Sequence, residues 1–459
     1  MLEKLARPEV LELIEAGDRD TLADFLNRWV PPDLAGLIAS LDERCQLYVL
    51  ESLSPALAAS TFVYLDVPGQ ERLLNALPQD RAAAILNDMA PDDRTALLEE
   101  FPPERRTLFL ERMSPEARSI ASKLLQYPED TIGRLMTPDY LAIHKDWTVK
   151  RVLDHVRTHG KKSETLGALY VVDDDGKLID DVRISKFLLS PLHTHVHDLM
   201  NLKFVGLKVT DDKREAVEIF RKYDRTALPV VDMQGHLVGI VTIDDVLDVA
   251  EEEATRELQQ FGGVEALDAP YIATPFFDLV RKRASWLVVL FLGEMLTATA
   301  MGFFEREIEK AVVLALFVPL IISSGGNSGS QAATLIIRAL ALGEVKLHDW
   351  WRVMRREMAS GLMLGVILGT IGFIRIAAWS AFSKIYGPHW LLVALTVGLS
   401  LVGIVLWGTL SGSMLPFLLR RLGFDPAASS APFVATLVDV TGLVIYFTVA
   451  LVVLHGTLL

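Results

Sequence analysis

The chain has 459 residues, of which 51% are hydrophobic, and a formal net charge of −14 at pH 7. Its length predicts several domains, and its acidic balance argues against a nucleic-acid partner, because phosphate binding needs a basic face. The single cysteine, Cys45, excludes an intrachain disulfide and predicts an intracellular first domain. The N-terminus has no apolar region typical of a secretory signal peptide.

Residues 50–118 repeat with a period of twelve. Proline follows most of the repeated apolar positions, and in 90–98 it is followed by acidic and then apolar residues, which is a helix-start signal. Short helices at a fixed period predict an all-α solenoid, which we place at residues 1–130. The repeated apolar positions are Leu53, Leu65, Leu77, Met89, Phe101 and Met113.

From about residue 134 the pattern changes to alternating strands and helices, which predicts an α/β domain over residues 131–248. This tandem resembles a pair of CBS modules, which are small βαββα units that often bind adenosine nucleotides. The second module keeps the pattern of that family at Gly239, Thr242 and Asp245. The resemblance implies that Thr242 bonds a phosphate and Asp245 a ribose of a nucleotide such as ATP. The corresponding segment of the first module, 182–187, has neither residue type.

Three alternating histidines, His193, His195 and His197, lie where the two modules join. Histidines at this spacing share one face of an extended segment and could bind a transition metal. Without a carboxylate or supporting residues nearby, the pattern favours a solvated linker.

A charged helix follows the second module, and we assign residues 249–275 to an acidic connecting helix. Spacings of three and four place several of its carboxylates on one face without lysines to pair with them. Such a run is usually a solvated face, but here it precedes the membrane segments and could respond to Mg²⁺, which binds few carboxylates and retains water. The acidic residues of this region are Asp244, Asp245, Asp248, Glu251, Glu252, Glu253 and Glu257.

Five apolar stretches after residue 284 are each long enough to cross a bilayer at about 1.5 Å per residue. They predict a five-helix transmembrane domain over 276–459. Basic residues gather before the first stretch and in two alternate loops, which predicts a cytoplasmic N-terminus and an outside C-terminus in the cytoplasmic membrane. The stretches are about 286–303, 311–339, 358–380, 390–418 and 432–455.

The second apolar stretch contains a run of small and polar residues at 319–331. Such residues permit close packing between helices, or they line a water-filled cavity, and the sequence favours neither interpretation. Glu294 and Arg375 also lie within apolar stretches, and the sequence gives neither a clear role.

Asp439 lies within the apolar run 433–447. An ionised carboxylate at bilayer depth is costly, so it normally faces water, a partner or a cation. One interpretation is a protonated carboxyl that hydrogen-bonds to another helix. The other is a carboxylate that attracts a cation into a pore.

In this order, the parts resemble the MgtE family of magnesium channels. The most specific matches are 325–331 continuing to 340, 435–442, and 414–421 followed by Asp425 and Pro426. The resemblance implies a homodimer with one pore on its two-fold axis, in which the Asp439 carboxylate binds the ion, with the Ala435 carbonyl one turn earlier and Asp425 near the cytoplasmic mouth. It also implies cytosolic Mg²⁺ sites that hold the closed state, at Asp92, Asp224, Asp245, Asp248, Glu253 and Glu257.

Three positions depart from the family pattern. Arg256 is basic on the connecting helix, and Ser60 and Ala96 lack carboxylates that the family uses in the N-terminal domain. These departures predict looser closure by cytosolic magnesium.

We therefore expect a magnesium-selective channel that is gated by cytosolic Mg²⁺. The alternatives are a transporter that couples cations to protons through Asp439 or Glu294, and a membrane-anchored Mg²⁺ sensor. An anchor requires neither Asp439 nor the glycine-rich run, which argues against the sensor. No nucleophile–base arrangement or phosphate-cradling loop is evident, so we do not expect an enzyme.

Overall fold

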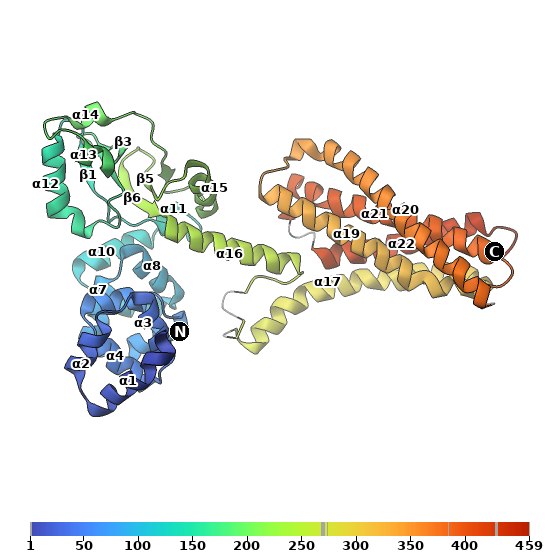
Figure 1. Ribbon diagram of the computed structural model, residues 1–459, viewed down its shortest axis with the longest axis horizontal. Coiled ribbons are helices and arrows are strands. Elements are labelled where there is room, and N and C mark those ends of the chain that lie inside the picture. Colours follow the sequence, from blue (N-terminus) through green and yellow to red (C-terminus); the bar gives the residue numbers. More distant parts are fainter. Residues whose placement is uncertain (1, 268–270, 273, 384, 427–429, 459) are drawn as a thin grey trace. The chain divides into compact units, whose positions relative to one another are not determined.

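The computed structural model describes residues 2–267, 271–272, 274–383, 385–426 and 430–458. They form two compact units, which divide between residues 251 and 252. Figure 1 shows short helices and an α/β part in the first unit and long helices in the second.

The first unit begins with a stack of short helices, α1–α10, around one apolar core that extends from Val10 to Ala121. The stack confirms the predicted solenoid. The helices are α1 (Leu2–Ala16), α2 (Arg19–Leu26), α3 (Pro31–Ala39), α4 (Glu43–Ser52), α5 (Pro55–Phe62), α6 (Val67–Ala76), α7 (Gln79–Asp88), α8 (Pro91–Glu100), α9 (Pro103–Arg112) and α10 (Pro115–Leu124).

The twelve-residue period gives several turns of the solenoid the same ending and a similar beginning. Leu77, Met89 and Phe101 are each buried in extended conformation directly after a helix. Proline then opens α8 and α9, where its missing N–H would have had no partner within the helix.

A second twelve-residue series, which we did not predict, ties five of the helices to the helix before them. Arg106 donates from Nε to the Leu98 carbonyl at 2.9 Å and from Nη2 to the Glu99 carbonyl at 2.8 Å. Such carbonyls at a helix end have no partner within their own helix. The residues in this series that donate to the preceding helix end are Gln46, Gln70, Arg94, Arg106 and Arg118.

Two three-stranded sheets follow, and their matching order confirms the predicted pair of CBS modules. In each sheet the first strand pairs parallel with the second, and the second pairs antiparallel with the third. The elements are α11 (Ile132–Leu135), β1 (Ala142–His144), α12 (Val149–His159), β2 (Ala168–Val172), β3 (Leu178–Arg183), α13 (Ile184–Leu189), α14 (Val196–Leu199), β4 (Leu207–Lys208), α15 (Lys213–Tyr223), β5 (Ala227–Val231) and β6 (Leu237–Thr242).

The two modules interlock through their first residues. The Ile132 amide donates to the Asp211 carbonyl at 2.8 Å, and the Thr137 amide donates to the Ile240 carbonyl at 2.9 Å. The segment that opens the first module is therefore bonded to the second module. After β6 the chain continues into α16 (Ile243–Phe261), which spans the division between the two units.

Within the described residues, five helices are long and apolar enough to cross a membrane, as the sequence predicted. They are α17 (Phe276–Phe303), α19 (Val318–Ala341) with the short helix that precedes it from Val312, α20 (Trp350–Phe382) with its preceding turn from Leu347, α21 (Trp390–Arg421) and α22 (Ala431–Val453). A short helix, α18 (Glu305–Lys310), follows α17.

Glycines allow the backbones of α19, α20 and α21 to touch. A Cβ atom built at Gly365 on α20 would lie 2.8 Å from Val402 Cα, and one built at Gly329 on α19 would lie 3.0 Å from the Gly408 carbonyl oxygen. Such close approach is the usual means of helix association in lipid, where apolar surface gives no net drive. One face of the small-residue run in α19 is therefore a packing face.

Helix α17 runs parallel to α22 but buries none of its residues within the chain. The Trp286 indole, in the fourth turn of α17 counted from Phe276, donates at 3.0 Å to the Oγ of Ser430, which caps the start of α22. Further along, the rings of Phe304 and Phe447 stack with centroids 5.0 Å apart. The rest of α17 exposes large apolar side chains, which include Leu287, Val288, Phe291, Leu292, Met295 and Leu296.

Candidate functional site

Asp439 lies in the third turn of α22, half-buried against the glycine-rich run of α19. A Cβ atom built at Gly326 would lie 3.8 Å from Asp439 Oδ1 and 3.5 Å from Ala435 Cβ. The structure thus brings Asp439 and Ala435 together beside α19. Among the described residues, no side chain hydrogen-bonds to the Asp439 carboxylate.

A polar stripe runs along the exposed face of α19. Ser323, Asn327, Gln331 and Thr334 are exposed at spacings of three and four residues, opposite the face that packs on α21. Asn327 donates to Ser323 Oγ at 3.4 Å, one turn away. Polar side chains on a membrane helix normally face protein or water rather than lipid. Close packing between helices therefore describes one face of this run, and the exposed polar face suits the lining of a water-filled cavity.

Glu294 on α17 is the second carboxylate in this region and lies within electrostatic range of Asp439. The contact between the helices is close here, because a Cβ atom at the neighbouring Gly293 would lie 3.1 Å from Thr436 Cγ2. The structure thereby gives Glu294 a place beside Asp439 that the sequence did not predict.

In the first unit, carboxylates gather where α8 of the solenoid meets the start of α16. Asp92 is buried, and the neighbouring charge of Asp245 acts on it. Asp93 likewise faces Asp244 and Asp248. Of the predicted cytosolic ligands, the structure therefore brings Asp92, Asp245 and Asp248 into one acidic group.

Burial makes this group costly when it is fully ionised. Loss of water raises the pKa of Asp93 to about 6, with the charges of Asp244 and Asp248 adding to the effect. Burial also raises the pKa of Asp245 to about 7, against a 2.6 Å hydrogen bond from Thr242 that lowers it. The pKa of Asp92 is raised well above its usual value by burial and by Asp245. Protons or cations must offset this charge.

One oxygen of the group has no hydrogen-bond partner among the described residues. Asp92 Oδ1 is buried without a donor, and buried polar atoms of this kind normally have one. An oxygen of this type suits a hydrated cation or a proton. No three carboxylate, histidine or cysteine side chains in the described ranges converge closely enough to hold a metal ion as placed.

Other predicted ligands lie elsewhere. Asp224 is exposed at the end of α15 in a left-handed conformation, with φ of 50°. Glu253 pairs with Arg256 at 3.3 Å, so the basic departure on this helix neutralises one of its carboxylates. Burial raises the pKa of Glu257, followed by the charges of Asp425 and Glu253, which places Glu257 and Asp425 within range of each other.

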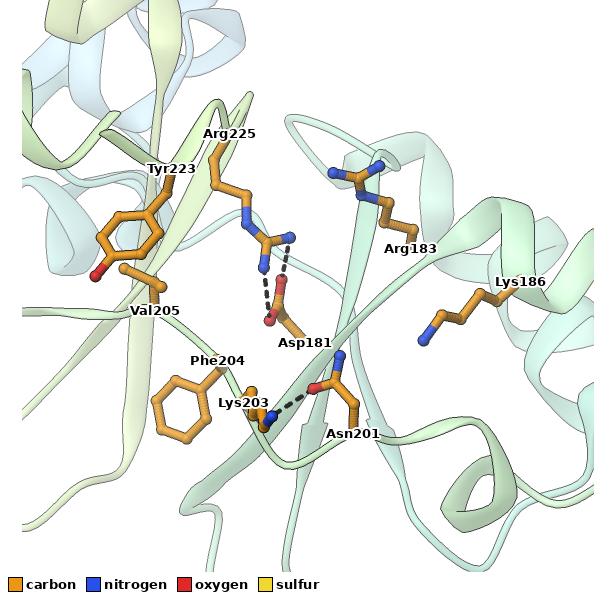
Figure 2. A pocket seen from close by; sticks show the side chains of 9 residues that line it. All are labelled: Asp181, Arg183, Lys186, Asn201, Lys203, Phe204, Val205, Tyr223 and Arg225. Carbon is orange, nitrogen blue, oxygen red and sulfur yellow. Dashed lines mark hydrogen bonds and ion pairs between the residues drawn. The ribbon is translucent and has the colours of Figure 1, made fainter. Parts of the chain in front are cut away.

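The predicted nucleotide residues are bonded to each other, since Thr242 Oγ1 donates to Asp245. A basic cavity of about 530 Å³ lies at a different place, between the two modules. Figure 2 shows Arg225 directed at Asp181, with Arg183, Lys186 and Lys203 around the same space. Its lining residues are Asp181, Arg183, Lys186, Asn201, Lys203, Phe204, Val205, Tyr223 and Arg225.

A buried carboxylate holds the loop that forms one wall of this cavity. Asp180 Oδ2 accepts from the amides of Asn201 and Leu202 at 2.7 and 3.0 Å, and Leu202 adopts a left-handed conformation with φ of 56°. Across the cavity, Arg225 Nη1 lies 2.8 Å from Asp181 Oδ2. Sequence reasoning missed this site because its basic residues come from three separate segments of the chain.

Comparison with known proteins identifies the family. The models for a divalent cation transporter, an MgtE intracellular N domain and CBS domains match residues 318–449, 29–130, and 132–188 with 196–252. The magnesium transporter MgtE of Thermus thermophilus is 44% identical over 333 residues, which are 72% of each chain. That of Enterococcus faecalis is 30% identical, over 72% of this chain and 70% of the relative. This chain belongs to the MgtE family.

Solved structures agree with this result for the first unit. A crystal structure described as the cytosolic domain of the Mg²⁺ channel MgtE in complex with ATP covers 53% of this chain and 99% of its own, with 34% identity and a TM-score of 0.51. The soluble part of a magnesium transporter covers 55% of this chain and 99% of its own, with 25% identity and a TM-score of 0.53.

Membership of the MgtE family indicates that the five apolar helices span a membrane. The chain is a multi-pass membrane protein of a magnesium transporter family, which is not a class of enzymes. Asp439, Ala435 and the polar stripe of α19 all fall within the part that matches the divalent cation transporter model. The membrane site is therefore the candidate for binding the transported ion.

Proposed function

We propose that this chain forms a magnesium-selective channel for Mg²⁺ uptake across the cytoplasmic membrane. The observation that carries the proposal is the half-buried Asp439 carboxylate beside Gly326 on α19, next to the exposed polar stripe of the same helix. A carboxylate at bilayer depth attracts a cation, and the stripe offers oxygen and amide groups to the water that the ion retains.

The pore lies on the two-fold axis of a homodimer in this proposal. The polar stripe of α19 must face water or protein rather than lipid. The same stripe on a second copy would provide a protein surface, and water would fill the space between the two stripes. The basic loops before α17, before α20 and after α21 orient the chain with its N-terminus in the cytoplasm and its C-terminus outside. Magnesium entering from outside then meets a ring of two Asp439 carboxylates.

Uptake into liposomes tests the ion site. Asp439→Asn removes the charge and keeps the size, so we expect Mg²⁺ entry, measured with an internal fluorescent indicator, to fall at least tenfold. Asp439→Glu, which keeps the charge, should retain a measurable part of the flux. Wild-type flux in Asp439→Asn would show that the carboxylate has a structural role only.

The coupled transporter remains the alternative, because Glu294 lies within range of Asp439. The same liposomes distinguish the two mechanisms. A channel gives discrete single-channel openings, and its Mg²⁺ flux does not change internal pH. Proton movement in fixed proportion to Mg²⁺, abolished by Glu294→Gln, would favour coupling.

Cytosolic Mg²⁺ closes the channel in our proposal by bridging the acidic group of α8 and α16. The buried Asp92 oxygen without a donor and the raised pKa values of Asp93 and Asp245 support this role. The ion needs only to bind the packed arrangement more tightly than the separated one to shift their populations. Asp224, Glu253 and Glu257 also belong to our proposed set of Mg²⁺ ligands, although they are not part of this acidic group and Glu253 is paired with Arg256.

The basic cavity between the CBS modules is our candidate for a nucleotide site. Four basic side chains against one carboxylate suit phosphate groups, and Phe204 and Tyr223 are exposed enough to stack on a base. A related cytosolic domain was crystallised with ATP. We expect ATP affinity, measured by titration calorimetry, to fall about tenfold in Arg183→Gln or Lys203→Gln.

Thr242→Val provides the matched test of the site that the sequence suggested. If the basic cavity binds the nucleotide, this variant should bind ATP like the wild type. Loss of binding in Thr242→Val with normal binding in Arg183→Gln would instead place the nucleotide at the motif of the second module.

A further inference from the structure

Three of the ten histidines, His144, His155 and His159, lie in the first CBS module, and two of them contact one tryptophan. The ring centroids of His144 and Trp147 are 5.3 Å apart, and those of Trp147 and His155 are 5.1 Å apart. His159 follows one turn later on α12, with its centroid 4.4 Å from that of His155. Neither the membrane site nor the acidic group includes these residues.

The spacing of His155 and His159 fits two ligands of one ion. Residues four apart lie on the same face of a helix. Two imidazoles that each bind one ion at about 2.1 Å hold their ring centres roughly 5 Å apart. Since the centroids already lie 4.4 Å apart, only small rotations of the two rings are needed.

The two rings differ in how firmly they are held. His155 is partly buried beside Trp147, with ring centroids 5.1 Å apart, whereas His159 is exposed at the end of α12. One ligand of the pair is therefore positioned by its neighbours, and the other is open to solvent.

The nearby charges do not block an ion at this pair. The positive charge of Arg151 would repel a cation at this pair, but its guanidinium lies over the Trp147 ring, 4.3 Å from the ring centroid. Arg157 is paired with Asp154 at 3.0 Å. His159 is exposed on the solvent side of the helix. Because no third histidine or acidic side chain within the described ranges converges on the pair, water would complete the coordination.

We propose that His155 and His159 bind a divalent transition-metal ion such as Zn²⁺, Ni²⁺ or Co²⁺. Imidazole nitrogens favour these ions, whereas Mg²⁺ prefers oxygen ligands. The site is therefore chemically separate from the acidic group that we assign to Mg²⁺. In the channel that we propose, this site would let the cytosolic part respond to a divalent ion other than Mg²⁺.

The alternating histidines of the linker are a weaker candidate. The rings of His195 and His197 stack with centroids 5.2 Å apart. Both ring nitrogens of His197 have other neighbours, since Nδ1 lies 3.3 Å from the Lys145 carbonyl and Nε2 lies 3.4 Å from Asp198. These histidines therefore serve as a control.

Titration of the full-length, tag-free protein with Ni²⁺ in detergent and saturating Mg²⁺ tests the proposal. Ni²⁺ bound beside Trp147 should quench part of the fluorescence, and Trp147→Phe should lack that part. Calorimetry should detect one Ni²⁺ site per chain, weakened roughly tenfold or more in His159→Gln. His159 is exposed, so this variant should fold normally, as circular dichroism can verify.

The combined variant His193→Gln, His195→Gln and His197→Gln should bind Ni²⁺ like the wild type. Wild-type affinity in His159→Gln, or loss of the site in the linker variant, would overturn the proposal. Saturating Mg²⁺ keeps the result independent of the proposed Mg²⁺ gating, which is measured by ion flux.

Discussion

The buried carboxylates of α8 and α16 make the packing of these two helices dependent on pH. In the packed arrangement the pKa is about 6 for Asp93 and about 7 for Asp245, whereas both have an ordinary value of 3.8 when the helices are apart. A raised pKa means that the packed form binds protons more tightly. The resulting stability is present at low pH and is lost as the pH rises through about 6 to 7.

Without Mg²⁺, lowering the pH from 8 to 6 should therefore stabilise the first unit by about 1–2 kcal/mol. Thermal unfolding followed by circular dichroism measures the effect. In Asp245→Asn the melting temperature at pH 8 should rise, and its dependence on pH should weaken. Asp154→Asn, which changes an exposed carboxylate on α12, is the matched control. A melting temperature that falls on acidification would contradict this assignment.

Single residues were predictable where their chemistry conflicts with their surroundings. Asp439 stands out because it is a carboxylate in an apolar run. Asp92 and Asp245 are ordinary acidic residues in the sequence, and only the family resemblance singled them out. The ion pair of Arg225 and Asp181 joins two modules, so no local pattern could have revealed the basic cavity.

Among the elements, the solenoid depends on long side chains that reach the end of the preceding helix. Arg106 donates to three backbone carbonyls, whereas the adjacent Arg105 forms an exposed ion pair with Glu71. Arg106→Met keeps the apolar stem but leaves those carbonyls without their donor. We expect it to destabilise the solenoid by about 1–3 kcal/mol.

Arg105→Met is the matched control, since exposed ion pairs contribute at most about 1 kcal/mol. Denaturant unfolding of the two variants gives the comparison directly. Equal losses of stability in both would show that the carbonyl contacts contribute nothing beyond surface charge.

The kinds of element could be predicted better than their ends. Apolar stretches identified all five membrane helices, but α17 begins at Phe276 rather than near residue 286, because charged residues at 278 and 281–283 interrupt the apolar pattern of its first turns. The capping series escaped notice because its residue type changes, from glutamine to arginine, and because alanine interrupts it at Ala58 and Ala82. Hydrophobic periodicity alone could not find it.

At the scale of the whole molecule, the second unit has two surfaces that a single chain does not cover. The polar stripe of α19 is exposed, and α17 buries none of its residues. Lipid suits the apolar side chains of α17, but it does not suit Asn327 and Gln331. A dimer that pairs the two α19 stripes resolves this conflict.

Cross-linking in membranes tests that pairing. In a Cys45→Ser background, Asn327→Cys should give a covalent dimer with a short bis-maleimide, detected by gel electrophoresis. Ile371→Cys, at an exposed apolar position of α20, should remain monomeric under the same conditions. Cross-linking at residue 371 but not at residue 327 would place the interface on a different helix.

Because the capping contacts repeat every twelve residues, the solenoid can gain or lose residues in steps of twelve and keep these contacts. Deleting residues 103–114 would bring Arg118 to the end of α8, in the place that Arg106 now occupies. Deletions of any other length would leave donors facing the wrong carbonyls. The length of the solenoid can therefore change by whole turns, while the structure of each turn stays the same.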